Sequence, residues 1–109
     1  MASANDRAKK PLILIVDDVP ANLHVLATAL RDDYRIKIAL DGATALELAG
    51  READHPDLIL LDVMMPLMSG HDVLRRLREK PETREIPVVF VTADTSEGSE
   101  VKGLQLGAF

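Results

Sequence analysis

Three aspartates stand at the ends of two apolar runs. Asp17 and Asp18 directly follow residues 12–16, and Asp62 directly follows residues 58–61. An apolar run of this length is typical of a strand that is buried on both faces, as in a parallel sheet covered by helices. If the two strands are neighbours, three carboxylates converge in the crevice outside their carboxyl ends, where open α/β sheets bind ligands. Like charges that close resist ionising together, so we predict a metal-assisted carboxylate centre or raised pKa values.

The elements that would position these aspartates alternate along the chain. After a loose tail at residues 1–10, the apolar pattern predicts strands at residues 12–16, 35–39, 57–61 and 88–91. Helical periodicity predicts helices at residues 20–30, 43–52, 73–80 and 97–106. This alternation implies right-handed βαβ units and therefore a doubly wound parallel sheet of the α/β class. We expect the domain to span residues 11–109.

The amino-acid composition predicts the kind of core and argues against several classes of function. A chain of 109 residues with 47% apolar but only 3% aromatic content predicts one domain with an aliphatic core. A net charge of −5 argues against a nucleic-acid or membrane surface. The absence of cysteine excludes disulfides, zinc-thiolate sites and a thiol nucleophile. The longest apolar stretch, Pro11 to Val16, is too short to cross a bilayer, so a cytoplasmic protein is expected.

Three segments together resemble the receiver domain of two-component response regulators. These are residues 13–18, residues 57–66 and residues 86–93, and Gly70 and residues 102–108 extend the match, which runs from about Leu12 to Phe109. The acidic pair, the acidic strand end and the Thr-Ala strand end occur in order and at suitable spacings. The resemblance implies a flavodoxin-like fold with strand order 2-1-3-4, which is four of the family's usual five βα units.

The resemblance assigns roles to the acidic residues. It implies that Asp62 is the phosphoacceptor, which takes a phosphoryl group from the phosphohistidine of a sensor histidine kinase or histidine phosphotransfer domain. The implied cofactor is Mg²⁺ (or Mn²⁺), held directly by Asp18, through water by Asp17, and by Asp62 and the backbone carbonyl of Met64. Hard cations of this kind favour oxygen ligands. Such a receiver assists its own phosphorylation but is not a turnover enzyme.

The resemblance also assigns roles to residues near the fourth strand. Thr92 would donate its hydroxyl to a phosphoryl oxygen and act as a switch, and the small side chain of Ala93 would leave the phosphoryl group room to enter. Met64 and Asp94 occupy positions that tune the lifetime of the phosphate. Because an apolar Met64 cannot orient the attacking water, slow self-dephosphorylation is expected.

The sequence departs from the family pattern after Phe109, where a fifth strand ending in Lys-Pro and a fifth helix would follow. Lys102 lies in the predicted fourth helix, so this chain has no active-site lysine. We therefore expect inefficient phosphotransfer by the fragment and an output domain beyond Phe109. An uncovered fourth strand also predicts homodimers or exchange of elements.

Other interpretations stay open at this point. A receiver of this length could serve only as an interaction or dimerisation module. A haloacid-dehalogenase-like phosphatase also uses an aspartate nucleophile, but it needs a second acid two residues later, where this chain has Met64. Singly, Asp18 could be a helix N-cap and Thr92 an ordinary strand residue. The arginines at residues 75, 76 and 78 are predicted to form a solvated helix face.

Overall fold

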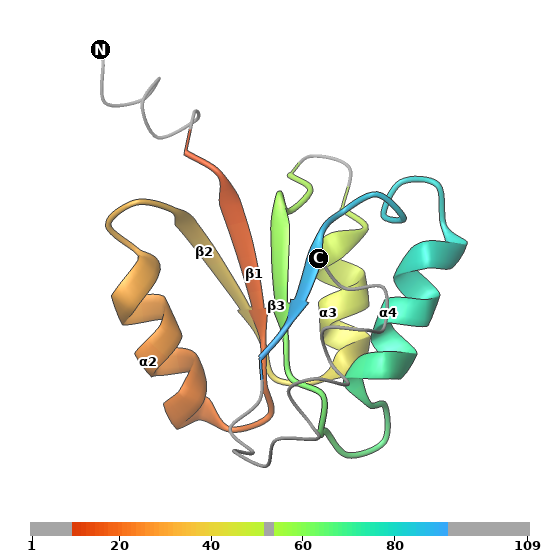
Figure 1. The fold of residues 1–109 in the computed structure, drawn as a ribbon, viewed down its shortest axis with the longest axis horizontal. Coiled ribbons are helices and arrows are strands. Elements are labelled where there is room, and N and C mark those ends of the chain that lie inside the picture. Colours follow the sequence, from red (N-terminus) through yellow and green to blue (C-terminus); the bar gives the residue numbers. More distant parts are fainter. Residues whose placement is uncertain (1–9, 52–53, 92–109) are drawn as a thin grey trace.

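The computed structural model describes residues 10–51 and 54–91, and these form a four-stranded parallel sheet with helices on both faces (Figure 1). The sheet order is β2-β1-β3-β4, as predicted. The strands are β1 (Leu12–Val16), β2 (Arg35–Ala39), β3 (Leu58–Leu61) and β4 (Val88–Phe90). The helices are α2 (Pro20–Leu30), α3 (Gly42–Ala49) and α4 (Gly70–Glu79). In Figure 1 the carboxyl ends of the strands point downwards, and the loops there join each strand to the following helix.

Strand β1 is the centre of the core, and all five of its residues are buried. Because side chains alternate across a strand, its residues divide between two apolar clusters. Ile13 and Ile15 pack in the cluster that contains Leu23 of α2, and Leu14 and Val16 pack in the larger cluster beneath α3 and α4. The buried side chains are almost all aliphatic, as the composition predicted.

The other strands are less uniformly buried than β1. In β3, Ile59 and Leu61 are buried against the α3 and α4 side, whereas Leu58 and Leu60 are half-buried on the α2 side. The prediction that this run is buried on both faces is therefore correct for β1 and only partly so for β3. Strand β2 lies at the edge of the sheet and is partly exposed, as its alternating sequence indicated.

Capping side chains set the helix boundaries that the apolar pattern placed less accurately. Helix α4 begins at Gly70, three residues before the predicted start, because Ser69 and Asp72 form a capping box in which each side chain bonds the other residue's backbone N–H. Helix α3 begins after Asp41, whose Oδ1 accepts a hydrogen bond from the N–H of Thr44 at 2.7 Å. It ends at Ala49, before the predicted residue 52.

Strand β3 starts at Leu58 and not at residue 57, because Asp57 has a different role. Its Oδ2 accepts a hydrogen bond from the N–H of Leu12 at 2.8 Å, which ties the start of β1 to the segment before β3. Strand β4 ends at Phe90, one residue earlier than predicted, although the N–H of Val91 still donates to the carbonyl of Leu61 at 2.9 Å.

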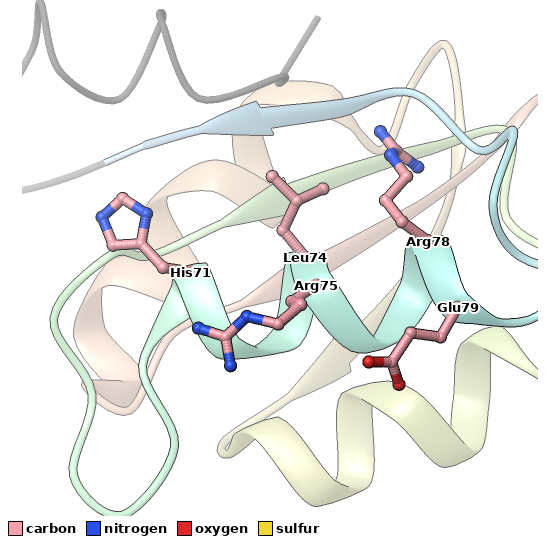
Figure 2. Close-up of a pocket in the computed structure, with 5 residues that line it drawn as sticks. All are labelled: His71, Leu74, Arg75, Arg78 and Glu79. Atoms are coloured by element: carbon pink, nitrogen blue, oxygen red, sulfur yellow. The ribbon is translucent and has the colours of Figure 1, made fainter.

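The basic face of α4 is partly structural. Arg75 and Arg76 are exposed, as predicted, but the Nη1 of Arg78 donates to two backbone carbonyls of the segment before β4, those of Arg84 at 2.8 Å and Ile86 at 2.9 Å. This side of α4 also lines an open cleft of about 480 Å³. Figure 2 shows the residues along it, which are His71, Leu74, Arg75, Arg78 and Glu79. Arg78 thus binds the segment that leads into β4. The prediction of a wholly solvated helix face is therefore wrong at this residue.

Several predicted features lie outside the described residues. They include the tail at residues 1–9, the helix at residues 97–106 and the position of Lys102. Within the part of the chain that the structure describes, no helix has the length and apolar character needed to cross a bilayer.

Candidate metal and phosphoacceptor site

The register of the sheet brings Asp17 and Asp62 together. Val16 of β1 is paired with Leu61 of β3, so the residues that follow them stand side by side at the carboxyl edge. The backbone continues this pairing, because the N–H of Asp62 donates to the carbonyl of Val16 at 2.9 Å. On the other side of β1, the N–H of Asp17 donates to the carbonyl of Ala39 at 3.1 Å. The sheet itself therefore fixes the backbone of both acids.

The carboxylates of Asp17, Asp18 and Asp62 form one cluster. An oxygen of each lies within 4.8 Å of an oxygen of the others. Asp17 and Asp62 are buried, with exposed fractions of 5% and 7%, and Asp18 is half-buried. The sequence prediction that three carboxylates converge outside the ends of β1 and β3 is confirmed.

Asp17 is held by the start of α2. Its Oδ1 accepts the N–H of Val19 at 2.9 Å, and its Oδ2 accepts the side-chain N–H of Asn22 at 3.1 Å. Val19 is the N-cap of α2, and no side chain caps this helix, so the interpretation of Asp18 as an N-cap is wrong. Asn22 was not singled out from the sequence. Its position, five residues after Asp17 and just inside a helix that starts at Pro20, is the only sequence signal for this contact.

Asp62 is held by the loop that follows β3. Its Oδ1 accepts the N–H of Met64 at 3.3 Å. The loop then folds back so that the N–H of Gly70 donates to the carbonyl of Val63 at 2.9 Å. A Cβ on Gly70 would overlap the backbone carbonyl of Asp62 and lie 3.0 Å from the Cα of Val63. Glycine at residue 70 thus allows α4 to begin directly against the backbone of Asp62, because no other residue fits this space.

The electrostatics of the cluster make Asp62 an unusual carboxylate. Its pKa is raised from the ordinary value of 3.8 to about 6, mainly by burial and next by the negative charges of Asp17 and Asp18, while the N–H of Met64 opposes the rise. None of the ion pairs found among residues 10–51 and 54–91 involves these three acids; the pairs join Asp54 to Arg35 and Lys37, Glu47 to Arg51, and Asp72 to Arg75. The negative charge of the cluster is therefore uncompensated by a side chain in the described structure.

The donor set suits a hard divalent cation. All three groups are carboxylates, which are the ligands that Mg²⁺ prefers, and among residues 10–51 and 54–91 no nitrogen or sulfur ligand joins the cluster. A cation here would also relieve the repulsion that raises the pKa of Asp62. Of the other predicted site residues, Met64 is exposed and its backbone bonds Asp62, whereas Thr92, Ala93 and Asp94 lie outside the described residues.

The chain that carries this acidic cluster matches a known protein family. The family model described as the response regulator receiver domain matches residues 13–109 of this chain. The chain belongs to the response regulator receiver domain family. Its function is accordingly that of a phosphoacceptor receiver in two-component signalling, and the haloacid-dehalogenase-like alternative is set aside.

Similar proteins agree with this assignment. The response regulator PleD of Caulobacter vibrioides is 50% identical over 97 residues, which are 88% of this chain but only 21% of PleD. A response regulator receiver protein of Methanoculleus marisnigri has an N-terminal domain that is 38% identical, with a TM-score of 0.77 over 91% of this chain and 80% of that one. The receiver domain of a sensor histidine kinase of Pseudomonas aeruginosa, PA1611, is 32% identical with a TM-score of 0.76, and 90% of this chain and 80% of that one are covered. That receiver was solved with a magnesium ion coordinated in its active-site cleft. The present receiver domain thus spans about a fifth of the length of PleD.

Proposed function

We propose that Asp62 is the phosphoacceptor of this receiver domain and that Asp17, Asp18 and Asp62 hold the divalent cation that phosphorylation requires. The observation that carries the proposal is the position of Asp62, a buried carboxylate at the end of β3 with two further carboxylates within 4.8 Å. A carboxylate whose pKa is about 6 is ionised at neutral pH and is therefore able to act as a nucleophile.

The transfer itself is a substitution at phosphorus. An oxygen of the Asp62 carboxylate forms a bond to the phosphorus of a phosphohistidine, and the bond between phosphorus and the imidazole nitrogen breaks. The imidazole leaves with the electron pair of that bond and takes up a proton from solvent. Because Oδ1 of Asp62 accepts the N–H of Met64, we assign the attack to Oδ2.

The other residues of the cluster orient Asp62 and the cation. Asn22 and the N–H of Val19 fix both oxygens of Asp17, so that this carboxylate keeps one orientation before any ligand arrives. Asp18 and the backbone carbonyl of Met64 are proposed as the further protein ligands. When bound, a Mg²⁺ or Mn²⁺ ion offsets the charge of the three carboxylates and of the transferring phosphoryl oxygens. Thr92 and Ala93 are proposed to contact and admit the phosphoryl group.

The partners follow from the chemistry. We propose that the donor is the phosphohistidine of a sensor histidine kinase or a histidine phosphotransfer domain. Phosphorylated Asp62 would then change the activity of an output domain in the same protein. In this role the receiver domain undergoes one phosphorylation per signal and does not turn over a substrate as an enzyme does.

Labelling by a small phosphoryl donor tests the proposal. Acetyl phosphate with Mg²⁺ is expected to phosphorylate the receiver domain on Asp62, and chelation of the metal is expected to abolish labelling. Intact-mass measurement detects the added group, and reduction with borohydride followed by peptide mapping identifies the residue. Labelling that persists without metal, or that maps to another residue, would contradict the proposal.

The lifetime of the phosphate tests the role of Met64. This residue is 70% exposed beside Asp62, and its side chain has no strong hydrogen-bonding group with which to orient a water molecule. Met64→Asn is therefore expected to shorten the half-life of the aspartyl phosphate by about tenfold, because positioned polar groups assist attack by water. The decay of labelled protein after removal of acetyl phosphate measures this effect, and Met64→Leu, which stays apolar, should decay like the wild type. Equal decay of the Asn and Leu variants would show that residue 64 does not control hydrolysis.

A further inference from the structure

The loop after β3 exposes one methionine beside the proposed phosphoacceptor. Residues 62–69 form this loop and contain three methionines. Met64 is 70% exposed, whereas Met65 is buried in the core and Met68 is half-buried. The sulfur of Met68 packs at the start of α3, where it lies 2.8 Å from the position that a Cβ on Gly42 would take. Of the three, Met64 is therefore the methionine that a dissolved molecule reaches most readily.

A backbone hydrogen bond fixes residue 64 next to the carboxylate of Asp62. The N–H of Met64 donates to Oδ1 of Asp62 at 3.3 Å. Asp62 itself is only 7% exposed, so a water molecule that attacks a phosphoryl group on it comes from the solvent side. Met64 is an exposed residue in direct contact with this carboxylate. The chemical nature of its side chain therefore bears on how water approaches the phosphorus.

The thioether of a methionine reacts with hydroperoxides. A lone pair of the sulfur forms a bond to one peroxide oxygen, and the bond between the two oxygens breaks. With hydrogen peroxide, the departing hydroxide takes the proton of the transferred oxygen and becomes water. The sulfur loses two electrons and the peroxide gains them, which leaves methionine sulfoxide. This chain contains no cysteine, so none of its own thiols competes for the oxidant.

Oxidation changes what the side chain of Met64 can do to water. The thioether is a weak hydrogen-bond acceptor, whereas a sulfoxide is polar and carries an oxygen that accepts hydrogen bonds. The sulfoxide oxygen is attached to the fourth atom of the side chain counted from Cα, as the amide oxygen of glutamine is. Oxidation at residue 64 therefore resembles a change from an apolar side chain to a glutamine.

We propose that Met64 is a site of oxidative modification by hydroperoxides and that its sulfoxide shortens the lifetime of the phosphate on Asp62. The proposal rests on the proposed function, because it needs a phosphate on Asp62. The sulfoxide oxygen accepts a hydrogen bond from a water molecule and orients it for attack. The water oxygen forms a bond to phosphorus, the bond between phosphorus and the Asp62 oxygen breaks, and the carboxylate leaves with that electron pair. A proton of the water passes to solvent.

Limited treatment with hydrogen peroxide tests the first step. Peptide mapping by mass spectrometry measures sulfoxide at each methionine as a function of time. Met64 is expected to be oxidised about tenfold faster than the buried Met65, with Met68 between them, because reaction with a dissolved oxidant requires exposure. Equal rates at Met64 and Met65 would refute the accessibility on which the proposal depends.

The decay of the phosphate tests the second step. The oxidised receiver domain is freed of peroxide and labelled with acetyl phosphate and Mg²⁺, and intact mass follows the phosphate after the donor is removed. Oxidation is expected to shorten the half-life about fivefold, because a positioned polar group assists attack by water. Methionine sulfoxide reductases should restore the original half-life. Met64→Gln should decay as fast as the oxidised protein without any peroxide.

Two leucine variants locate the effect, because leucine keeps an apolar side chain of similar volume but has no sulfur. In Met64→Leu, peroxide should leave the half-life within twofold of that of the same variant without treatment. In Met68→Leu, peroxide should shorten the half-life as it does in the wild type. Shortening in oxidised Met64→Leu would assign the effect to another residue and refute the proposal.

The remaining results separate this proposal from the proposed function. A half-life that oxidation of Met64 leaves within twofold, or lengthens, would refute the role of the sulfoxide and leave Asp62 as the phosphoacceptor. If acetyl phosphate does not label the untreated wild type on Asp62, the proposed function fails, and the proposal for Met64 fails with it.

Discussion

Asp62→Asn is expected to abolish phosphorylation of the receiver domain and, at neutral pH without metal, to make the folded domain more stable. The two effects have opposite signs because the same buried charge is useful for chemistry and unfavourable for folding. Burial, together with repulsion from Asp17 and Asp18, raises the pKa of Asp62 from 3.8 to about 6. That difference corresponds to roughly 3 kcal/mol as an upper bound, so a gain of about 1–3 kcal/mol in the free energy of unfolding is expected.

The pH dependence of this gain has a definite direction. The folded domain holds the Asp62 proton more tightly than the unfolded chain does, so protonation of Asp62 favours folding. The contribution is fully favourable below pH 3.8 and is lost as the pH rises through about 6. The wild type should therefore lose stability relative to Asp62→Asn between about pH 4 and pH 6, and the difference should be constant above pH 7.

Urea unfolding at several pH values measures the free energy of unfolding of the wild type and of Asp62→Asn. Circular dichroism monitors the unfolding, because the chain contains no tryptophan to report by fluorescence. The control is Asp32→Asn, which changes an exposed aspartate at the end of α2 and should alter stability by less than about 0.5 kcal/mol. Millimolar Mg²⁺ should stabilise the wild type and act much less on Asp62→Asn, since a ligand stabilises only the state that binds it. A variant that is less stable than the wild type at pH 7 without metal would contradict the buried-charge argument.

The acidic cluster was predictable because it depends on local sequence and one general property of parallel sheets. The apolar runs before Asp17 and Asp62 identify two strands, and the carboxyl ends of parallel strands lie at one edge. That β1 and β3 are direct neighbours was supplied by the family resemblance and is confirmed by their pairing. The clustering of three oxygens within 4.8 Å follows from that adjacency.

The residues that hold the cluster in place were not predictable in the same way. The contact of Asn22 with Asp17 depends on where α2 starts, to within one residue. Leu67, in the loop after β3, has a φ angle of 68°, and nothing in the residue type of a leucine indicates a positive φ. The early start of α4 depends on reciprocal side-chain caps that the apolar pattern does not include.

The role of Gly70 was also not predictable from the sequence. This residue matters because it has no Cβ, and not because of its own backbone conformation. A glycine shortly before a predicted helix is most simply explained as a residue that lets the chain turn there. The structure gives a different reason, which is that a Cβ at this position would overlap the backbone carbonyl of Asp62. Backbone atoms cannot move aside as the end of a flexible side chain can.

Gly70→Ala is therefore expected to destabilise the domain by about 3 kcal/mol or more, at the upper end of the cost of overpacking. To accommodate the methyl group, either α4 or the backbone at Asp62 must shift. A shift at Asp62 disturbs the cluster, so the apparent affinity for Mg²⁺ should fall as well. Urea unfolding measures the first effect, and calorimetric titration with Mg²⁺ under conditions where the variant is folded measures the second.

The other two described glycines, at the start of α3 and just after its end, supply matched controls. At Gly50 the nearest atom to a new Cβ is the carbonyl oxygen of Leu46 at 3.4 Å, an ordinary contact, so Gly50→Ala should change stability by less than about 0.5 kcal/mol. At Gly42 the nearest atoms are Sδ of Met68 at 2.8 Å and Cγ2 of Val73 at 2.9 Å. Because the thioether of Met68 is flexible, Gly42→Ala should have an intermediate cost. The expected order of destabilisation is Gly70, then Gly42, then Gly50, and a Gly70→Ala variant as stable as Gly50→Ala would show that α4 does not press against Asp62 in solution.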